Sequence, residues 1–349
     1  MKIAVLISGG VDSSVALRLL HEQGHELTAF YLKIWLEDDL KFLGDCPWEE
    51  DLKYVREICD EIKVPLKVLP FQKEYFETVV AYTIDEVKKG NTPNPDMMCN
   101  NNIKFGLFLD KEGKNFDKVA TGHYAQLVEK NGKFLLKRAP DPIKDQTYFL
   151  GRLSQKQLSK AMFPIGHLQK NEVRELAEKY SLPNKTRKDS QGICFLGKFK
   201  YNEFINHYLG IKKGDIVEYE TGKKLGEHEG FYYYTVGQRK GIKLPDGPWY
   251  IVDKNIDKNI IYASKNYHGE DKKRNTLIVQ DFNWFIEKPD KLKLKVKLRH
   301  GEQMYDCKIN FKGETAEITL DRDDQGIAPG QFAVFYDDDI CLGSASIKD

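Results

Sequence analysis

Apolar and polar residues follow two different patterns along this chain. Over the first 200 residues, apolar runs typical of buried strands occur at 2–7, 26–35, 65–70 and 118–128. Between them, apolar residues recur at helical spacing in segments near 15–20 and at 48–63, 74–90, 154–162 and 171–180. This alternation predicts an α/β domain with an open parallel sheet covered by helices.

Turn and cap signals refine this prediction. Asn131-Gly132 between apolar runs indicates a hairpin. Ser154 and Asn171 stand where the last two helices of the domain should begin, and both residue types favour the N-cap.

After about Tyr201 the pattern changes. One short helix at 201–210 precedes strands separated by Gly, Asp and Asn turns, expected at 214–222, 231–241, 249–255 and 259–266, and a second β-rich stretch begins near Asn275. We predict one α/β domain at 1–200, followed by two small β-rich domains at 201–273 and 274–349.

The composition fits this organisation. The chain has 349 residues, of which 41% are hydrophobic and 31% charged, as expected for a soluble multi-domain protein. No early segment has the order of a signal peptide, and no apolar run approaches the roughly 20 residues that span a bilayer. We therefore expect a cytoplasmic protein, in which structural disulfides rarely persist. The six cysteines form no CxxC pair or zinc-spaced Cys/His cluster, so no metal site is predicted.

Charge is distributed less evenly than the net charge of +1 suggests. From Arg138 to Lys200 the chain carries 13 Lys and Arg but six Asp and Glu, an excess of seven positive charges. Such a stretch is either a solvated helical surface or a face that binds a polyanion, and composition alone leaves both open. If it binds RNA, affinity should fall steeply as salt rises.

The segment SGGVDSS, residues 8–14, joins the first predicted strand to the first helix. At such a junction, backbone N–H groups and the helix dipole bind phosphate. Glycine allows a close approach of oxygen, and the serines add hydroxyl donors. The segment lacks the lysine of the GxxxxGK[ST] loop, which disfavours transfer of a γ-phosphoryl group. It resembles the loop of the ATP pyrophosphatases, which release pyrophosphate while AMP activates a carbonyl or amide oxygen.

Two cysteines lie in unusual settings. Cys99 follows a proline-rich approach and lies three residues after Asp96, within reach across a helical turn. Cys194 follows the basic cluster at 185–188, where positive charge favours thiolate over the ordinary thiol pKa of roughly 8.5. From the residues alone, each is either a reactive thiol or an inert buried one.

The other four cysteines receive no functional role, and Cys46 is assigned no packing role either. Cys59 lies on the apolar face of a predicted helix, and Cys307 and Cys341 lie in predicted strands. All three are expected to pack in cores, because thiols behave as small hydrophobes.

Nine motifs in order resemble the tRNA-specific 2-thiouridylase family, and they span residues 8 to about 343. They are SGGVDSS, TPNPDMMC, IKFG, TGHYA, KDQTYFL, PIGHLQKNEVRELA, DSQGICFLG, YTVGQRKG and APGQFAVFYDDDICLG. The resemblance implies an adenine-nucleotide α-hydrolase-like (PP-loop) first domain and a C-terminal β-barrel.

It also implies residue roles. Cys194 would receive sulfur as a persulfide, Cys99 would help deliver it, with a Cys99–Cys194 disulfide left to be reduced, and Asp96 would be an acid/base residue. The implied ATP-binding positions are Ile7, Ser8, Gly9, Gly10, Val11, Asp12, Ser13, Ser14, Leu32 and Gly122. The implied tRNA-contacting positions are Asn94, Pro95, Asp96, His123, Lys144, Asp145, Gln146, Arg299, His300 and Gln331.

Two further segments have alternative interpretations. Residues 291–300, KLKLKVKLRH, place Leu and Val on one side of a strand and Lys293, Lys295, Lys297 and Arg299 on the other. These cations either contact a phosphate backbone or protect a sheet edge, and the match of Arg299-His300 favours RNA at the far end. The tyrosines at 232–234 either stack on bases or belong to a core, and we assign them no site role.

The resemblance implies an ATP-dependent enzyme that 2-thiolates the wobble uridine of tRNA by adenylating O2, transferring persulfide sulfur and releasing AMP and pyrophosphate. Mg²⁺ is expected with ATP, and tRNAs for Lys, Glu and Gln as substrates. A cysteine desulfurase or a sulfur-carrier protein is expected as the donor. The rivals are another adenylating enzyme with this loop and a noncatalytic RNA-binding protein that senses ATP. Neither would need both Cys99 and Cys194.

Overall fold

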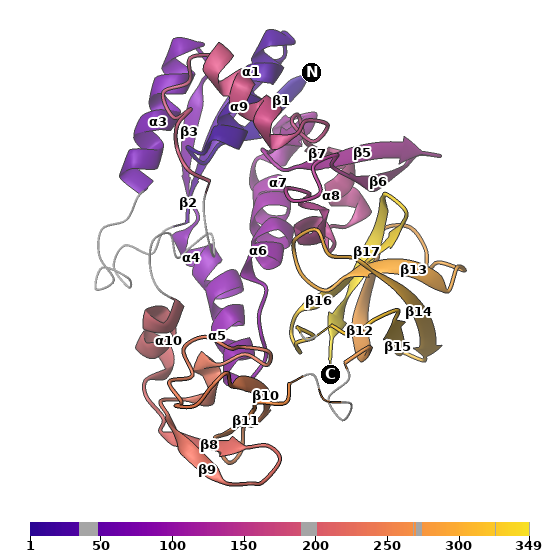
Figure 1. Ribbon diagram of the computed structural model, residues 1–349. Helices are drawn as coiled ribbons and strands as arrows, with labels where there is room; N and C mark the ends of the chain where they lie inside the picture. Colours follow the sequence, from indigo (N-terminus) through magenta and orange to yellow (C-terminus); the bar gives the residue numbers. More distant parts are fainter. Residues whose placement is uncertain (35–47, 190–200, 268, 270–273, 325, 349) are drawn as a thin grey trace.

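The computed structural model describes residues 1–34, 48–189, 201–267, 269, 274–324 and 326–348. The chain forms three domains: an N-terminal α/β domain, a central β-rich domain and a C-terminal barrel. They lie around a continuous helical segment at residues 72–88, which ends against the central domain (Figure 1). None of the described helices is long and apolar enough to cross a membrane.

The first domain contains the predicted parallel sheet. Its strands are β1 (Lys2–Leu6), β2 (Glu26–Lys33), β3 (Leu66–Pro70), β4 (Lys118–Ala120) and β7 (Ala161–Met162). All pairings are parallel, in the order β3-β2-β1-β4-β7. From β1 the chain therefore first adds β2 and β3 on one side of the sheet, and later adds β4 and β7 on the other side of β1.

Successive side chains of β1 point to opposite faces of the sheet, and each face is covered by helices. Ile3, Val5 and Ile7 pack in one cluster with α1 (Val11–Glu22), α3 (Trp48–Glu61) and α9 (Lys170–Lys179). Ala4 and Leu6 pack in the other cluster with a second helical layer. That layer contains α4 (Gln72–Tyr75), η2 (Phe76–Val80), α5 (Ala81–Lys88), α6 (Pro95–Met98), η3 (Cys99–Leu107), α7 (Phe108–Lys111) and α8 (Gln155–Lys160). Short 3₁₀ turns are η4 (Gly113–Asn115) and η5 (Thr147–Leu150).

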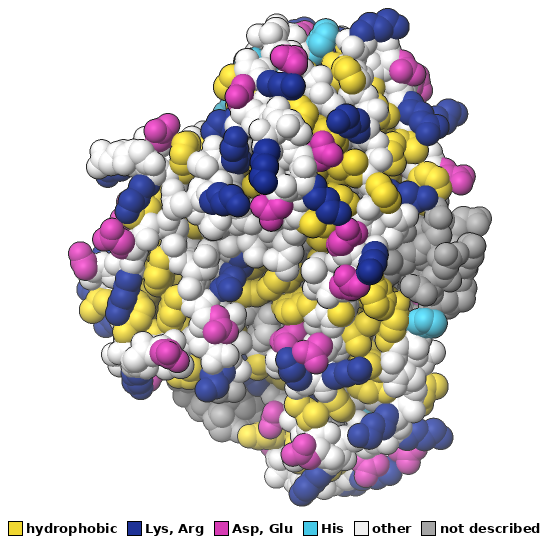
Figure 2. All heavy atoms as spheres, turned by 180° about the vertical axis from the view of Figure 1, so that it is seen from behind, with side chains coloured by type: hydrophobic (Ala, Val, Ile, Leu, Met, Phe, Trp, Pro, Cys, Tyr) yellow, Lys and Arg dark blue, Asp and Glu magenta, His cyan; other side chains and the backbone are white. Residues whose placement is uncertain are grey.

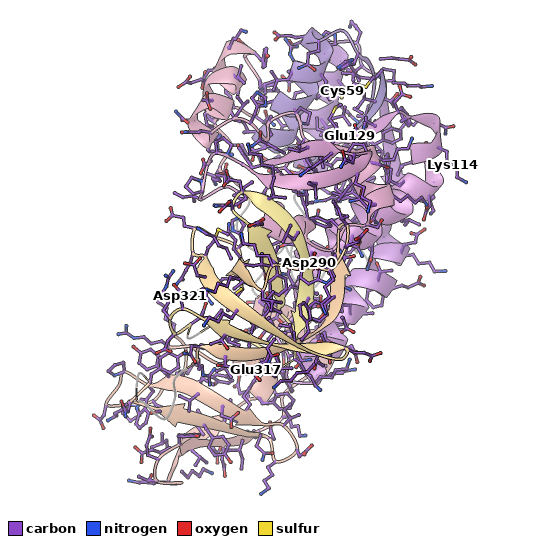
Figure 3. All side chains as sticks on the ribbon, turned by 90° about the vertical axis from the view of Figure 1, so that its right-hand side faces the viewer. Cys59, Lys114, Glu129, Asp290, Glu317 and Asp321 are labelled. Carbon is purple, nitrogen blue, oxygen red and sulfur yellow. The ribbon has the colours of Figure 1, made fainter. Side chains whose placement is uncertain are left out.

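The predicted single strand at 118–128 is wrong, because the chain breaks it after β4. Gly122 turns directly against the start of α1, and β5 (Ala125–Lys130) then pairs with β6 (Lys133–Arg138) as the predicted hairpin. Asn131 and Gly132 take positive φ values of 53° and 72°, as a tight hairpin turn requires. β6 also pairs with barrel strand β17, so the hairpin, marked by Glu129 in Figure 3, extends the barrel sheet.

Helix starts agree with one predicted cap and correct the other. Ser154 accepts from the Gln157 N–H and closes a capping box at the start of α8. At α9 the N-cap is Gln169, whose N–H donates to the Glu172 carboxylate over 2.7 Å, so the prediction of Asn171 was wrong by two positions.

The central domain begins with α10 (Tyr201–Leu209) and has a sheet in the order β10-β11-β8-β9. Its strands are β8 (Gly214–Glu218), β9 (Lys224–His228), β10 (Tyr250–Asn255) and β11 (Ile260–Ser264). The predicted strand at 231–241 is wrong: Phe231–Tyr233 forms the 3₁₀ turn η6, and β9 was not predicted. The turn forms because the Tyr232 and Tyr233 hydroxyls donate to the Gly210 carbonyl, which draws both rings against α10.

The last domain is the expected barrel. Its strands are β12 (Thr276–Trp284), β13 (Lys293–Lys297), β14 (Tyr305–Lys312), β15 (Thr315–Leu320), β16 (Phe332–Asp337) and β17 (Ile340–Ile347). β12 pairs with both β15 and β17, which closes the barrel. β13 lies between β14 and β16, so it is not an edge strand.

Candidate active site

Residues 8–14, the predicted phosphate-binding segment and from here on the phosphate loop, lie at the carboxyl end of β1 and lead into α1. Gly9 has φ +78°, and a Cβ there would lie 2.8 Å from the Asp51 carbonyl oxygen, so this position requires glycine. The Ser13 and Ser14 hydroxyls donate to the Gly10 carbonyl over 3.0 and 2.9 Å. These bonds fix the turn, at the end of α1 where backbone N–H groups favour an anion.

The other predicted ATP-binding positions, Leu32 and Gly122, lie on or just after the strands that flank β1, and Gly122 packs against the loop. Leu32 lies near the carboxyl end of β2, and Gly122 follows β4, the two strands on either side of β1. A Cβ on Gly122 would lie 2.6 Å from the Ser13 backbone nitrogen. Open α/β sheets bind ligands outside the carboxyl ends of strands where the chain changes direction across the sheet, and β1 and β4 form that point here.

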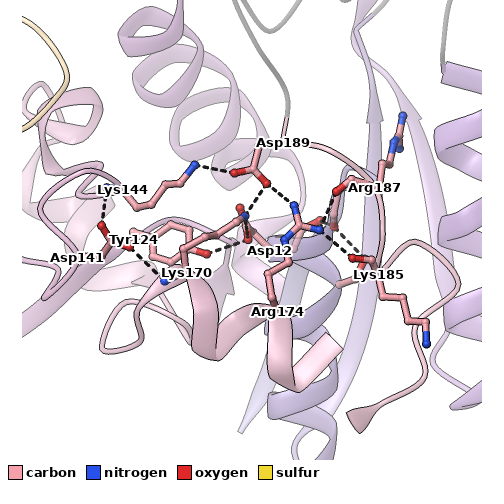
Figure 4. A network of polar contacts seen from close by, with 12 residues as sticks. Asp12, Tyr124, Asp141, Lys144, Lys170, Arg174, Lys185, Arg187 and Asp189 are labelled. Atoms are coloured by element: carbon pink, nitrogen blue, oxygen red, sulfur yellow. Dashed lines mark hydrogen bonds and ion pairs between the residues drawn. The ribbon is translucent and has the colours of Figure 1, made fainter. Parts of the chain in front are cut away.

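A cation from α9 reaches the loop across a long stretch of sequence. Lys170 Nζ lies 2.7 Å from Asp12 Oδ1 and 2.7 Å from Asp189 Oδ1 (Figure 4). The Tyr124 hydroxyl donates to the same Asp12 oxygen over 2.9 Å. Sequence reasoning missed Lys170, because no local pattern around it indicates a partner 158 residues away.

Asp189 joins the loop to the segment that contains Lys144. Lys144 Nζ lies 2.6 Å from Asp189 Oδ2, and Arg174 lies 2.7 Å from its Oδ1. Partial burial opposes ionisation, but hydrogen bonds from Lys144 and Lys170 outweigh it and lower the pKa of Asp189 to about 2. Lys144, predicted to contact tRNA, is therefore paired within the protein with the Asp189 carboxylate.

Residues 184–187 support the back of the loop. Asn184 Nδ2 donates to the Gly9 carbonyl over 2.8 Å and to Ser14 Oγ over 2.9 Å. Arg187 donates to the same carbonyl over 3.1 Å and forms an ion pair with Asp51. Much of the local positive charge is thus neutralised inside the fold, and basic and acidic side chains are interspersed on the face in Figure 2.

Cys99 is the first residue of the π-helical segment η3. Asn94 starts the preceding turn by accepting from the Met97 N–H over 3.1 Å, with Pro95 at the first helical position. The helical turn that would bring Asp96 within reach of Cys99 is therefore present. The Cys99 side chain is 2% exposed and packs on the sheet face opposite α1. Cys194 lies outside the described residues, and so does the predicted pairing of the two thiols.

The Asn94 turn is fastened to the barrel by Gln331. The Gln331 side-chain nitrogen donates to the carbonyls of Thr92 and Pro93 over 3.0 and 2.8 Å. Its side-chain oxygen accepts from Asn94 Nδ2 and from the Tyr148 hydroxyl, both over 3.3 Å. Two predicted tRNA-contacting residues that are 237 positions apart, Asn94 and Gln331, thus meet directly.

Three further predicted tRNA-contacting residues lie around this junction or beside the loop. His300 stacks on Phe149 with ring centroids 4.9 Å apart. His123 follows Gly122 and bonds through Nδ1 to the Thr121 hydroxyl over 2.7 Å. Burial, with a smaller effect of the Lys104 cation, lowers the pKa of His123 well below 6.5. Gln146 accepts from the Tyr124 N–H.

Asp145, another predicted tRNA-contacting residue, is fully buried in the structure. Its fully buried carboxylate lies 2.8 Å from Lys297 Nζ and 3.0 Å from Arg138 Nε. Lys297 is also 0% exposed, so the expectation that it presents an accessible cation beside the exposed Lys293 and Lys295 is wrong. The alternation of β13 is kept, because Lys297 pairs with Val334 on the side of the strand that also carries Lys295. This part of that side is covered by the first domain, where the buried Asp145 carboxylate needs a buried partner.

Arg299 forms an ion pair at the barrel, and three further cysteines lie in cores. Arg299 is 43% exposed at its side chain and donates to both carboxylate oxygens of Asp324 over 2.8 Å. Cys59, Cys307 and Cys341 are buried, as expected for packing residues. Burial raises the thiol pKa of Cys59 and of Cys307 to about 12. Among the described residues there is no cluster of three or more His, Cys, Asp or Glu that could hold a metal ion.

Comparison with known proteins covers the whole chain. Three family models match: a tRNA methyl transferase HUP domain at residues 1–198, a tRNA methyl transferase PRC-barrel domain at 202–265 and an aminomethyltransferase beta-barrel domain at 274–347. A protein of Parabacteroides distasonis, named tRNA-specific 2-thiouridylase MnmA, is 48% identical over 100% of this chain and 99% of its own. A Bacteroides thetaiotaomicron protein named tRNA-specific 2-thiouridylase MnmA 1 is 48% identical, and a Porphyromonas gingivalis protein named tRNA-specific 2-thiouridylase MnmA is 46% identical, each with 99% coverage of both chains. On this identity and coverage, the chain belongs to the tRNA-specific 2-thiouridylase family.

Proposed function

We propose that this protein is an ATP-dependent sulfurtransferase that replaces the O2 oxygen of the wobble uridine of tRNA with sulfur. One observation carries the proposal. The phosphate loop has no lysine of its own, and Lys170 of α9 reaches it at the carboxyl ends of the parallel strands. The full-length relatives named as 2-thiouridylases support the choice of substrate.

ATP would lie with its phosphates on residues 8–14. The loop N–H groups and the serine hydroxyls would hold the phosphates, and Lys170 would supply the cation that the loop itself lacks. Uridine O2 attacks the α-phosphorus, the bond to pyrophosphate breaks, and C2 becomes electrophilic. Since the described residues hold no metal cluster, Mg²⁺ would enter with ATP, bound largely by phosphate oxygens.

Sulfur transfer then needs two thiols. Cys194 carries the persulfide, whose outer sulfur adds to C2 as AMP leaves with the former O2 oxygen. The Cys99 thiolate attacks the Cys194 sulfur, which breaks the persulfide bond, leaves sulfur on C2 and forms a Cys99–Cys194 disulfide. A thiol reductant restores both cysteines before the next turnover. Asp96, one helical turn before Cys99, would move protons during these steps.

The tRNA side of the site would be built on the Asn94 turn. Extruding an unpaired wobble base costs a few kcal/mol at most, so a rigid receiving loop is the main requirement. The four Gln331 hydrogen bonds to this turn and to Tyr148 support such rigidity. Asp145 would act indirectly, by holding Lys144 and Gln146 in place. By family resemblance, the substrates are tRNAs for Lys, Glu and Gln, and the sulfur comes from a cysteine desulfurase or a carrier protein.

The test is mass spectrometry of nucleosides from tRNA incubated with the protein, ATP, Mg²⁺ and a persulfide donor. We expect 2-thiouridine with the wild type and at least a 1,000-fold loss in Cys99→Ser and in Cys194→Ser, on the order seen when catalytic nucleophiles are removed. Cys59→Ala, a buried thiol of α3, is the matched control and should retain activity.

Three results would contradict the proposal. Full 2-thiouridine formation in both serine variants would exclude the two-thiol mechanism. Formation of a methylated uridine would favour the activity suggested by the descriptions of the family models. Binding of tRNA without any modification would favour the noncatalytic alternative.

A further inference from the structure

A pocket of about 320 Å³ lies beside the Asn94 turn, between the first domain and the central domain. The first domain contributes Asn91–Pro93, the three residues that lead into Asn94. The central domain contributes Tyr201 and Asn202 of α10 and the tyrosines of 232–234. This volume lies within the range of small-molecule sites, and its wall continues into the proposed base-contacting loop.

The tyrosine rings are held in place. The hydroxyls of Tyr232 and Tyr233 donate to the Gly210 carbonyl over 2.9 and 2.8 Å, and the two ring centroids lie 4.9 Å apart. Tyr234 contacts the His228 ring edge-on at 5.8 Å. Because these contacts fix the rings before any ligand arrives, little side-chain entropy is lost on binding.

Lys254 fastens the two domains together at the pocket. Its Nζ donates to the Gly90 carbonyl over 2.6 Å and to the Tyr234 carbonyl over 3.1 Å. It is the one charged side chain in the part of the lining that the structure describes. The rest of the described lining consists of aromatic rings, amides, hydroxyls and the aliphatic Val87 and Pro93, which suit the flat face and polar edge of a nucleobase better than a phosphate group.

We propose that this pocket binds a nucleobase of the anticodon loop that neighbours the target uridine, an inference that rests on the proposed function. When the wobble uridine is extruded toward Asn94, its chain neighbours lose their stacking partner. The pocket begins at Pro93, the residue before Asn94, so a neighbouring base is carried to it by the same backbone. Stacking on a fixed tyrosine replaces the lost contact.

Binding of an anticodon stem-loop RNA that contains the wobble uridine tests this. Removing a stacking ring weakens single-stranded binding by roughly 5- to 150-fold per base, and we expect about tenfold for Tyr234→Ala. Tyr234→Phe keeps the ring and should bind within twofold of the wild type. Tyr219→Ala, a 45% exposed tyrosine of the same domain that does not line the pocket, is the matched control.

RNAs lacking the base on either side of the wobble uridine identify the occupant. To the wild type, one of these RNAs should bind about tenfold more weakly than the intact RNA. To Tyr234→Ala, the same RNA and the intact RNA should bind equally. Such non-additivity indicates direct contact between the missing ring and the missing base. Asn202→Ala, on the exposed surface of α10, provides a second variant if Tyr234→Ala unfolds, with an expected loss of about threefold.

Equal binding of the intact RNA by Tyr234→Ala and the wild type would overturn the inference, and so would additive losses with both shortened RNAs. Either result would favour an aromatic side chain of a protein partner as the occupant. The proposed function fails separately, if the wild type binds this RNA but forms no 2-thiouridine. In that case the non-additive loss would still establish the base pocket.

Discussion

Two regions of the molecule differ in the interactions that hold them together. One is the phosphate-loop edge, at the carboxyl ends of the parallel strands, and the other is the Gln331 junction, where the barrel meets the Asn94 turn. At the edge, Asp12, Lys170 and Asp189 form a charged chain around the start of α1. At the junction, Gln331 and Asn94 make neutral amide hydrogen bonds. A triphosphate requires charge, whereas an uncharged base requires shape and hydrogen bonds. The two regions should therefore separate ATP binding from tRNA binding when each is altered alone.

One segment connects the two regions. Lys144 pairs with Asp189 at the edge, and Tyr148 donates to Gln331 at the junction. Asp145 between them is anchored by Lys297 of the barrel. Changes at this anchor should disturb both regions, and they are expected to have the largest effect.

Lys297→Met leaves the buried Asp145 carboxylate with Arg138 as its remaining ion-pair partner among the described residues. Loss of one member of a buried pair costs about 3–5 kcal/mol, and the free energy of unfolding in urea should fall by that amount. Lys295→Met, at an exposed position of the same strand, is the control. Equal stability of the two variants would contradict the structural role of Lys297.

Lys170→Met should alter the edge alone. Without the cation at the phosphate loop, kcat/KM for ATP is expected to fall about 100-fold, the loss typical of one charge-stabilising group. Lys170→Arg should retain part of the activity, and binding of tRNA should be unchanged. Lys179→Met, an exposed lysine of the same helix, is the control for steady-state kinetics with ATP varied. An unchanged ATP dependence would remove Lys170 from the site.

Gln331→Leu should alter the junction alone. It removes three hydrogen bonds to the Asn94 turn and one from the Tyr148 hydroxyl. We expect kcat/KM for tRNA to fall about tenfold, since neutral hydrogen bonds contribute about 1 kcal/mol each and part of the loss is recovered by water. Gln303→Leu, at an exposed position of the barrel, is the control. A change in the ATP dependence instead would show that the regions are not separable.

His123 gives the smallest predicted effect, on stability. Its pKa is lowered well below 6.5 in the folded protein, so below pH 6.5 the unfolded chain takes up a proton that the folded chain does not. Stability is therefore complete above pH 6.5 and falls by about 1 kcal/mol between pH 6.5 and 5.5. His123→Gln should lose this contribution to the slope in denaturant titrations, whereas the exposed His21→Gln should keep it. The contributions of His228 and His300, whose pKa values are also lowered, should remain in both variants. Parallel slopes in all three proteins would contradict burial of a neutral imidazole.

Local patterns predicted local structure well. The strand-to-helix junction at SGGVDSS and the Asn131-Gly132 hairpin each depend on neighbouring residues, and both are confirmed. The helical turn that would bring Asp96 near Cys99 is also present. The tyrosine stretch at 231–241 misled the prediction, because β-propensity there is overridden by two hydroxyl bonds to the end of α10. Lys297 misled it as well, because a strict alternation cannot reveal a buried carboxylate 152 positions away.

By itself the sequence determined the order of the elements, the phosphate loop and the family resemblance, because these follow from the periodicity and identity of adjacent residues. Only the tertiary structure decided which cation serves the loop, which carboxylate neutralises Lys297 and which amide holds the Asn94 turn. Those pairings join residues more than 100 positions apart. They are selected by packing and by the need of every buried charge and polar group for a partner, and no short sequence window contains that information.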